Sequence, residues 1–277
     1  MSTVPFITLN NGVTMPQLGF GVGRVPADEA AGAVGTALEA GYRRIDTAAI
    51  YGNEEGTGTA LANAGVPRDE LFVTTKLRNG AQGYDSTLRA FDESLARLGL
   101  EQVDLYLIHW PLPARDSYLD TWRAFERIHR DGRARAIGVS NFQPAHLCRL
   151  INEAGVVPAV NQVELHPQLQ QGELRAFHTD HGIATEAWSP LGQGKGLLDE
   201  PVLASVGAKH GVTPAQAVLR WHLQLGNLVI PKSVTPSRIV ENFEVFGFEL
   251  DIDDLAAIAG LEQGKRLGPD PDFFDVG

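Results

Sequence analysis

Cysteine and long apolar runs are almost absent from this sequence. Cys148 is the single cysteine among 277 residues, so an internal disulfide framework is excluded. This usage fits a reducing compartment, and we expect a cytoplasmic protein in which Cys148 is a packing residue. No run approaches the roughly 18–20 apolar residues that span a bilayer, and no N-terminal segment has the pattern of a signal peptide. We therefore expect neither a membrane protein nor a secreted one.

Positive charge is also scarce. The chain has 23 basic and 34 acidic residues, and its formal net charge at pH 7 is -11. Binding to nucleic acid or to an anionic membrane surface needs a basic face, so neither is expected as a partner. Arginine supplies most of the cations, which makes a lysine in an unusual position informative. The five lysines are Lys76, Lys195, Lys209, Lys232 and Lys265.

Several familiar site motifs are missing. The nearest approach to the dinucleotide fingerprint G-x-G-x-x-G is GFGVG at residues 19–23, which does not open a helix at the required spacing. A Rossmann domain is therefore not expected. The sequence also lacks a G-x-S-x-G elbow, a cysteine–histidine pair and the histidine spacing of a zinc site. We expect neither covalent catalysis nor a metal centre.

Short apolar runs alternate regularly with amphipathic stretches along the whole chain. Helical periodicity marks residues 27–41, 86–99, 118–132 and 143–155, and each of these stretches ends in glycine, as helix C-caps do. The apolar runs are short enough to be strands. Eight such runs occupy residues 17–22, 42–48, 71–77, 104–109, 134–140, 159–165, 183–188 and 228–232.

Eight strand-then-helix units in this length fit a closed barrel better than an open doubly wound sheet. We predict an α/β fold, a (β/α)8 TIM barrel made by a single domain over residues 1–277. The interval before the last strand is longer than the others and contains two helix-like segments. Residues 4–18 predict a β-hairpin around Asn11-Gly12, a strong signal for a two-residue turn, and this hairpin would cap the N-terminal end of the barrel.

Polar and aromatic side chains recur at the predicted strand ends. In a barrel, catalytic groups gather at the C-terminal ends of the strands and in the loops that follow. Residues scattered by chance would not choose the same end each time, so we expect one functional rim. The candidates are Asp46, Lys76, His109, Ser140, Asn141, Trp188 and Lys232, with Gln162 inside the sixth strand and Tyr51 in the loop after the second.

Four of these candidates together suit proton transfer to a carbonyl group. A tyrosine with a pKa near ~10 is a poor acid at neutral pH. A lysine ammonium beside Tyr51 would lower that pKa, and Asp46 would keep Lys76 charged and in place. His109 could hydrogen-bond the carbonyl oxygen. Each residue alone has a purely structural explanation, since Asp46 could cap a helix or pair with a core arginine, and His109 and Tyr51 could be packing residues.

The segment IPKSVTPSRIVENF, residues 230–243, has the features of a phosphate site. Thr235 followed by proline predicts a capped helix start, where backbone N–H groups and the helix dipole favour an anion. Lys232 and Arg238 add positive charge there, and barrels often bind phosphate after the last strand. In the alternative explanation, Arg238 forms a surface ion pair with Glu241.

With these motifs in place, the sequence resembles the aldo-keto reductase family over nearly its whole length. Within that family it is similar to the bacterial branch that includes 2,5-diketo-gluconate reductases. The resemblance depends on seven segments in order and at compatible spacing, so it is highly specific. They are IDTAAIYGNE at 45–54, TTKL at 74–77, YLIHWP at 106–111, IGVSNF at 137–142, NQVELHP at 161–167, WSPLG at 188–192 and IPKSVTPSR at 230–238.

The resemblance implies a reductase that converts aldehydes and ketones to alcohols with NADPH, bound without a Rossmann fold. It implies a catalytic tetrad in which Lys76 and Asp46 tune Tyr51 as general acid and His109 orients the carbonyl. NADPH is expected over NADH because of Arg238. For the nicotinamide end of the cofactor, the resemblance implies that Trp188 stacks on the ring and that the carboxamide is held by Ser140, Asn141 and Gln162. It implies that the pyrophosphate is lined by Ser189, Leu191 and Gly192. At the other end, it implies that the 2′-phosphate is held by Lys232, Ser233, Val234 and Arg238, and that the adenine lies near Glu241 and Asn242.

One position departs from the family pattern. Relatives commonly place an aromatic residue facing the substrate after the first barrel strand, and this chain has Gly23 there. The missing wall should enlarge the substrate pocket or leave its closure to Trp110 and a C-terminal loop. That loop offers Phe273 and Phe274 as lids.

Two other functions are consistent with the residues alone. Lys76 could form a Schiff base with a carbonyl substrate in a barrel isomerase or lyase. A redox-sensing subunit could hold NADPH and turn over slowly. We expect a monomer, while the physiological substrate and the preferred direction cannot be read from the sequence.

Overall fold

A parallel β-barrel forms the centre of the protein. In the computed structural model, which describes residues 4–276, eight strands lie in the order β10-β9-β8-β7-β6-β5-β4-β3 with parallel neighbours. Leu18 forms a parallel bridge with Val229, so the first and last strands also meet. The predicted α/β barrel is therefore confirmed. The strands are β3 (Phe20–Gly21), β4 (Arg44–Asp46), β5 (Phe72–Leu77), β6 (Val103–Ile108), β7 (Ala134–Ser140), β8 (Val160–Glu164), β9 (Ala184–Trp188) and β10 (Leu228–Val229).

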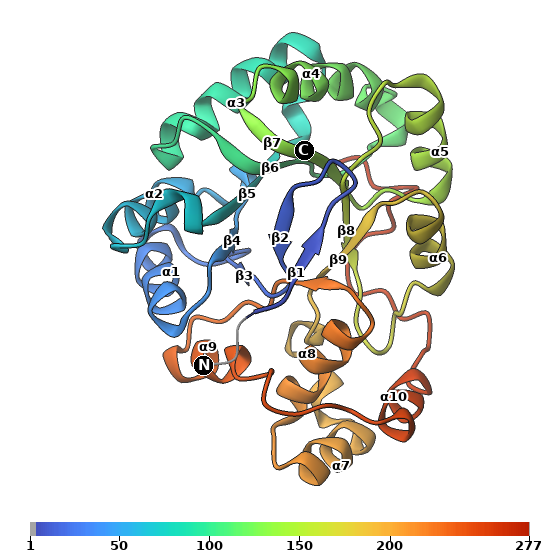
Figure 1. Ribbon diagram of the computed structural model, residues 1–277. Helices are drawn as coiled ribbons and strands as arrows, with labels where there is room; N and C mark the ends of the chain where they lie inside the picture. The colour runs from blue at the N-terminus through green and yellow to red at the C-terminus, as the bar shows by residue number, and fades with distance from the viewer. Residues whose placement is uncertain (1–3, 277) are drawn as a thin grey trace.

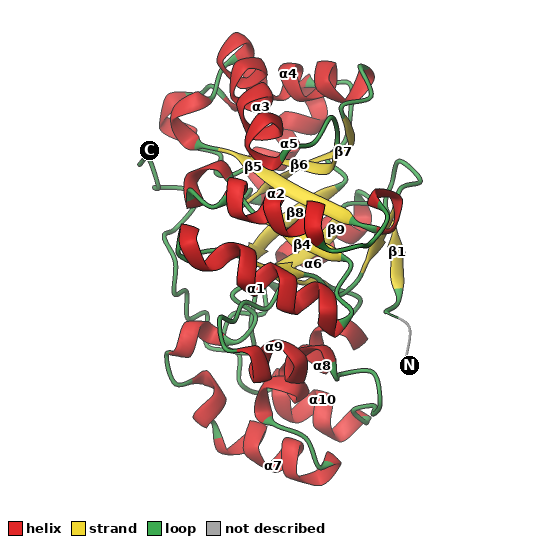
Figure 2. Ribbon diagram, turned by 90° about the vertical axis from the view of Figure 1, so that its left-hand side faces the viewer, coloured by secondary structure: helices red, strands yellow, loops and turns green. Residues whose placement is uncertain are grey.

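Helices surround the barrel on its outside (Figures 1 and 2). The four predicted amphipathic stretches form α1, α3, α4 and α5, and the long interval before the last strand contains α7 and α8 as predicted. The bounds are α1 (Ala27–Ala40), α2 (Glu54–Asn63), α3 (Tyr84–Leu98), α4 (Tyr118–Arg130), α5 (Pro144–Glu153), α6 (Gly172–Asp180), α7 (Pro201–His210), α8 (Pro214–Gln224), α9 (Pro236–Phe243) and α10 (Ile252–Ala259).

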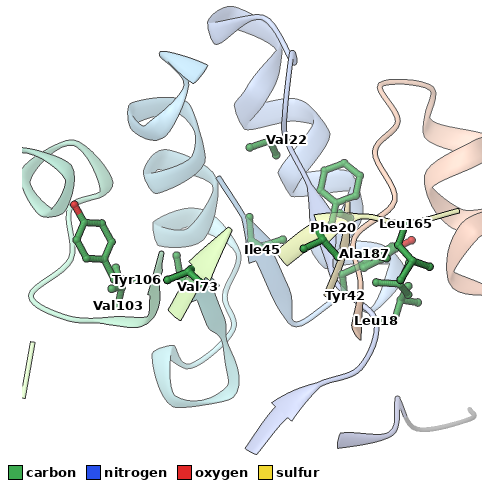
Figure 3. Packing of buried hydrophobic residues seen from close by; sticks show 14 of the residues in the cluster. Leu18, Phe20, Val22, Tyr42, Ile45, Val73, Val103, Tyr106, Leu165 and Ala187 are labelled. Carbon is green, nitrogen blue, oxygen red and sulfur yellow. The ribbon is translucent and has the colours of Figure 1, made fainter. Parts of the chain in front are cut away.

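The main core fills the space between the strands and the helices. In α4, Trp122 and Phe125 are fully buried and lie three residues apart, on the helix face that meets the sheet. Phe125 stacks on Tyr106 of β6 with ring centroids 4.4 Å apart. Phe20 meets Tyr42 edge to face with ring centroids 5.6 Å apart, and Figure 3 labels both residues within the core. The first of these ring contacts fixes α4 against β6.

An antiparallel hairpin covers the barrel end at which the strands begin. β1 (Phe6–Thr8) pairs with β2 (Thr14–Pro16), and the hairpin lies across the centre of the strands in Figure 1. Its tip is fixed to the barrel, because the Asn11 side chain donates to the Arg135 carbonyl at 3.0 Å. The predicted cap is confirmed, but the turn is longer than predicted. Leu9 N donates to Val13 O at 2.8 Å, which leaves three residues in the turn instead of two.

Three local predictions are wrong. α5 does not end at a left-handed Gly155, because Ala154 ends it in an extended conformation with φ -119°. Cys148 is exposed, since it lies on the outer face of α5. The last strand ends at Val229, so Lys232 lies in the following loop.

No helix within residues 4–276 combines the length and apolar character needed to cross a membrane.

Candidate active site

The C-terminal ends of the strands bring most of the predicted site residues to one rim. Asp46, Ser140 and Trp188 are the last residues of β4, β7 and β9. Lys76 is the penultimate residue of β5, and His109 directly follows β6. Parallel strands end at the same side of a barrel, so these residues share one face of the molecule.

Lys76 and Asp46 form a buried ion pair. Lys76 Nζ lies 2.5 Å from Asp46 Oδ1 and donates a second hydrogen bond to the Thr47 carbonyl at 2.9 Å. The lysine is fully buried and the aspartate almost so. Burial lowers the pKa of Lys76, but the charges of Asp46 and Tyr51 outweigh it and raise that pKa, so Lys76 stays an ammonium. Asp46 therefore neither caps a helix nor pairs with an arginine.

Tyr51 lies directly above the Lys76 ammonium. It is in the short 3-10 turn Ala49–Tyr51 between β4 and α2, and Lys76 Nζ is 5.2 Å from its ring centroid. Burial raises the pKa of Tyr51 above its ordinary value, while the charge of Lys76 acts to lower it. The expected net lowering is therefore not found, because desolvation of the phenolate exceeds the effect of the lysine.

Two residues that the sequence analysis missed hold the Tyr51 loop in place. The Asn53 amide donates to the Val22 carbonyl at 2.9 Å and accepts from Thr47 Oγ1 at 2.9 Å. Glu54, also buried, accepts from Thr75 Oγ1 at 2.6 Å on the strand that carries Lys76. Their positions two and three residues after the tyrosine in IYGNE were the available signal.

His109 faces Tyr51 across the rim. The two rings meet edge to face with centroids 5.7 Å apart. Burial and, secondarily, the charge of Lys76 lower the pKa of His109 to about 3. The imidazole is neutral at physiological pH, so one ring nitrogen can donate a hydrogen bond and the other can accept one.

Asn141 ties three strands of the rim together. Its Nδ2 donates to the His109 carbonyl at 2.9 Å and its Oδ1 accepts from Trp188 Nε1 at 2.8 Å. Ser140 Oγ donates to the Gln162 carbonyl at 2.8 Å. These bonds hold Trp188, which is partly exposed, beside Ser140, Asn141 and Gln162, the residues predicted for one end of the cofactor.

A chain of buried polar groups continues from the ion pair into the barrel interior. Gln162 Nε2 donates to Asp46 Oδ2 at 2.8 Å and to Glu186 Oε2 at 3.0 Å. Glu186 pairs with Arg44, and all of these side chains are nearly or fully buried. Sequence reasoning missed Arg44 and Glu186, although a charged residue within the short apolar strands RID and ATEAW was a usable signal.

The turn after β9 places the residues predicted for the pyrophosphate. Ser189 has a φ of 51°, and its Oγ accepts from Gln193 Nε2 at 2.9 Å. Gly192 also has a positive φ, and a Cβ on it would meet Leu197 at 2.6 Å, so only glycine fits. Leu191 packs against the core. Arg24 reaches Gln193 Oε1 at 3.4 Å from the loop after β3.

The loop after β10 and the start of α9 carry exposed cations. Within the described part of the chain, the side chains of Lys232 and Arg238 make no hydrogen bond and no ion pair. The surface ion pair between Arg238 and Glu241 is therefore not formed. Glu241 instead accepts from Thr213 Oγ1 at 2.8 Å. An open cavity of about 330 Å³ lies between α1 and the start of α9, and neither Lys232 nor Arg238 is among its lining residues. It is lined by Glu29, Gly32, Ala33, Thr36, Val234 and Pro236.

The predicted cap of α9 differs in detail. Thr235 occupies the N-cap position, but its side chain makes no capping hydrogen bond. Ser233 Oγ accepts from the Thr235 backbone N–H at 3.1 Å instead. Asn242 is almost fully buried within α9, whereas Val234 is exposed.

Gly23 leaves space beside Tyr51, and the C-terminal segment supplies part of a wall. A Cβ on Gly23 would lie 3.6 Å from the Tyr51 hydroxyl, an ordinary contact, so a larger side chain could stand there. Trp110 is half-buried and its ring lies 4.4 Å from that of Phe274, while Phe273 is 85% exposed. Phe274 thus contacts the rim as predicted for a lid, and Phe273 does not.

The C-terminal segment is anchored on β8 by Glu164. This buried carboxylate accepts backbone N–H groups from Leu267 at 2.6 Å and Gly268 at 2.8 Å. A Cβ on Gly268 would approach Trp188 to 2.6 Å, so the segment passes directly over the edge of the indole.

Among the residues described, no group of three or more His, Cys, Asp or Glu side chains could hold a metal ion.

Comparisons with known proteins agree with the motifs and the fold. Residues 14–263 match the Aldo/keto reductase family. An aldo-keto reductase from Mycolicibacterium smegmatis is 59% identical over 271 residues, 98% of each chain. Methylglyoxal reductase DkgA from Escherichia coli is 54% identical over 275 residues, 99% of each chain. A variant of Gox0644 solved in complex with NADPH superposes with a TM-score of 0.95 at 49% identity, covering 99% of each chain.

A match of this identity over 98–99% of each chain extends well beyond a shared barrel, because it covers the connecting loops as well as the strands and helices. The prediction of an enzyme of this kind is therefore confirmed. The chain belongs to the aldo/keto reductase family.

Proposed function

We propose that the protein reduces aldehydes and ketones to alcohols with NADPH, using Tyr51 as the general acid. The observation that carries this proposal is the buried Lys76–Asp46 pair, at 2.5 Å, directly beneath the Tyr51 phenol. An ammonium held in that position stabilises the phenolate that remains when Tyr51 gives up its proton. His109, neutral and 5.7 Å away ring to ring, would donate a hydrogen bond that orients the carbonyl oxygen.

The residues on the rim fit NADPH. Trp188 offers a partly exposed ring at one end. At the other end, Lys232 and Arg238 offer exposed side-chain charges that have no ion-pair partner among residues 4–276. Ser140, Asn141 and Gln162 would hold the carboxamide, with Ser189, Leu191 and Gly192 along the pyrophosphate. When bound, NADPH supplies the hydride for the carbonyl carbon. The 2′-phosphate would lie at Lys232, Ser233, Val234 and Arg238, and the adenine near Glu241 and Asn242. The complex of the relative Gox0644 with NADPH supports this choice of cofactor.

A small reactive carbonyl is the first substrate to test. The name of the relative DkgA, methylglyoxal reductase, suggests a dicarbonyl of this size. Gly23 and Trp110 would border the substrate, and the space beside Tyr51 would also admit bulkier carbonyls. We propose a single-domain, cytoplasmic monomer that acts on small molecules, in line with the net charge of -11 and the single cysteine.

The Schiff-base alternative is disfavoured by the state of Lys76. A lysine nucleophile must be a neutral amine that can reach the substrate. Lys76 is fully buried, paired with Asp46, and its pKa is raised. The remaining alternative, a subunit that binds NADPH but turns over slowly, is separated from a reductase by turnover.

The proposal is tested by NADPH oxidation with methylglyoxal and a panel of carbonyls, in the wild type and in Tyr51→Phe. We expect wild-type turnover and a loss of at least about 100-fold in kcat for the variant, since a positioned general acid contributes on that order. Quenching of tryptophan fluorescence by NADPH should be nearly unchanged in Tyr51→Phe. Comparable turnover in the two proteins would exclude the assigned role of Tyr51.

A further inference from the structure

Gln162 is held from behind by two carboxylates. Its Nε2 donates to Asp46 Oδ2 at 2.8 Å and to Glu186 Oε2 at 3.0 Å, so both hydrogens of the amide are used. Asp46 is paired with Lys76 and Glu186 with Arg44, so both carboxylates act as hydrogen-bond acceptors, and the NH2 group of Gln162, not its carbonyl, faces these oxygens. Within residues 4–276, Gln162 Oε1 has no hydrogen-bond partner.

Glu186 is fixed in turn by a residue that crosses the barrel. Arg44 pairs with Glu186 and also donates to the Val229 carbonyl at 2.8 Å. Both side chains are fully buried. A Cβ on Gly19 would lie 2.5 Å from Arg44 Nε, so the glycine leaves the space that the guanidinium occupies. The sheet register places Glu186 directly beside Gln162.

We propose that Glu186 is a positioning residue that fixes the orientation of the Gln162 amide and so presents Oε1 as a hydrogen-bond acceptor for the carboxamide NH2 of the cofactor. This inference rests on the proposed function, because it requires NADPH to be bound at Gln162. Without Glu186, a single acceptor at Asp46 would hold the NH2 group and the amide could turn. The carboxylate thus converts an amide that could donate or accept into one that only accepts at the rim.

The variant Glu186→Gln replaces a carboxylate, which only accepts hydrogen bonds, by an amide of similar shape, which can also donate them. Arg44 can only donate, so the new amide must turn its oxygen toward Arg44 and its NH2 toward Gln162. Gln162 Oε1 would then accept from residue 186 and be withdrawn from the cofactor. The probes are NADP+ and its acetylpyridine analogue, in which a methyl group replaces the carboxamide NH2.

Affinities for the two nucleotides are measured by quenching of tryptophan fluorescence. In the wild type we expect NADP+ to bind roughly 3- to 10-fold more tightly than the analogue, the range of one net hydrogen bond. Glu186→Gln should reduce that ratio to about one. The matched control is Asp104→Asn, which also neutralises a buried carboxylate between two arginines, Arg68 and Arg135, but has no bond to Gln162. Its ratio should remain that of the wild type.

Each other outcome has a distinct meaning. Equal weakening of both nucleotides in Glu186→Gln, with the ratio retained, would overturn the positioning role and leave only a structural one. Equal affinities in the wild type would overturn the inference while leaving the reductase proposal intact. Failure of the wild type to bind either nucleotide would overturn both. If Glu186→Gln does not fold, the double variant Arg44→Met with Glu186→Met leaves no unpaired buried charge, and the same fall in the ratio is expected.

Discussion

The proton of Tyr51 is subject to two opposing effects. Burial raises the pKa of the phenol, which keeps it protonated, whereas the Lys76 ammonium favours the phenolate that the proposed reaction would form. Asp46 makes this arrangement stable by holding Lys76 charged inside the barrel. The neutral state of His109 completes it, since burial and, secondarily, the charge of Lys76 lower the pKa of the imidazole. In the proposed reaction, proton donation by Tyr51 would therefore depend on Lys76 and Asp46, which need not touch the substrate.

At the same scale, Arg238 should decide the choice between the two nicotinamide cofactors. It is exposed and, in the described chain, has no ion-pair partner, so its guanidinium is available for a phosphate. Arg238→Ala should weaken NADPH binding by roughly 10-fold or more while NADH binding changes little. Fluorescence titrations with both nucleotides measure this, with Arg123→Ala, an exposed arginine paired with Asp120 on α4, as the control. Equal losses for NADPH and NADH would contradict the phosphate assignment.

Gly23 should widen the range of substrates. A tryptophan at this position would fill the space beside the Tyr51 ring, whose nearest atom would be 3.5 Å from a Cβ on residue 23. Gly23→Trp should lower kcat/KM for bulky ketones by roughly 10-fold while small aldehydes keep most of their turnover. Unchanged kinetics across small and bulky carbonyls would show that Gly23 does not border the substrate.

At the scale of elements, the loops that carry site residues are held by buried polar contacts to neighbouring strands. Asn53 and Glu54 join the Tyr51 turn to the loop after β3 and to β5, and Glu164 joins the C-terminal segment to β8. These contacts span many residues in sequence. The strands and helices were predictable because apolar periodicity is local, whereas which polar side chain meets which loop depends on the closed barrel.

The contact between α2 and α3 gives an element-scale prediction. Gly58 of α2 lies against the end of α3, where an added Cβ would be 2.3 Å from the Leu98 carbonyl oxygen. Gly58→Ala should reduce the free energy of unfolding by about 1–3 kcal/mol through overpacking. Gly35→Ala in α1, where no atom lies within 4 Å of the added Cβ, should raise it by about 0.5–1 kcal/mol. Urea unfolding measures both, and equal effects of the two substitutions would contradict the close packing of α2 on α3.

At the scale of the whole molecule, buried neutral histidines should make the fold sensitive to acid. Burial lowers the pKa of His178 to about 4 and that of His222 to about 3, below the ordinary value near ~6.5. As pH falls below that value, the unfolded chain takes up protons that the folded chain excludes, so stability is lost from pH ~6.5 down to ~4 for His178 and ~3 for His222. The loss should be about 1–2 kcal/mol per histidine at pH ~5.

Unfolding in urea at pH ~8 and ~5 measures this loss. His222→Asn is expected to be less stable than the wild type at the higher pH, but to lose less on acidification. An identical loss in the variant and the wild type would show that His222 is not responsible.

The sequence was sufficient for the barrel and for the placement of most rim residues, because motifs at strand ends report position directly. It was not sufficient for the direction of the Tyr51 pKa, since burial is a property of the folded state. Arg44 and Glu186 could not be paired in advance because they lie 142 residues apart and meet only inside the closed barrel. Lys232 was placed at the end of a strand because IPK continues the apolar run, although pairing stops at Val229.

The most direct test of the central claim is to follow the hydrogen atoms. Methylglyoxal is incubated with the enzyme and NADPH that carries deuterium on the hydride-donating carbon of its nicotinamide ring, and the product is analysed by mass spectrometry. With deuterium at both hydrogen positions of that carbon, hydride transfer predicts an alcohol with one deuterium on its carbinol carbon and one NADP+ formed per alcohol. A product without deuterium, formed without consumption of NADPH, would contradict the reductase account and return attention to a Schiff base on Lys76.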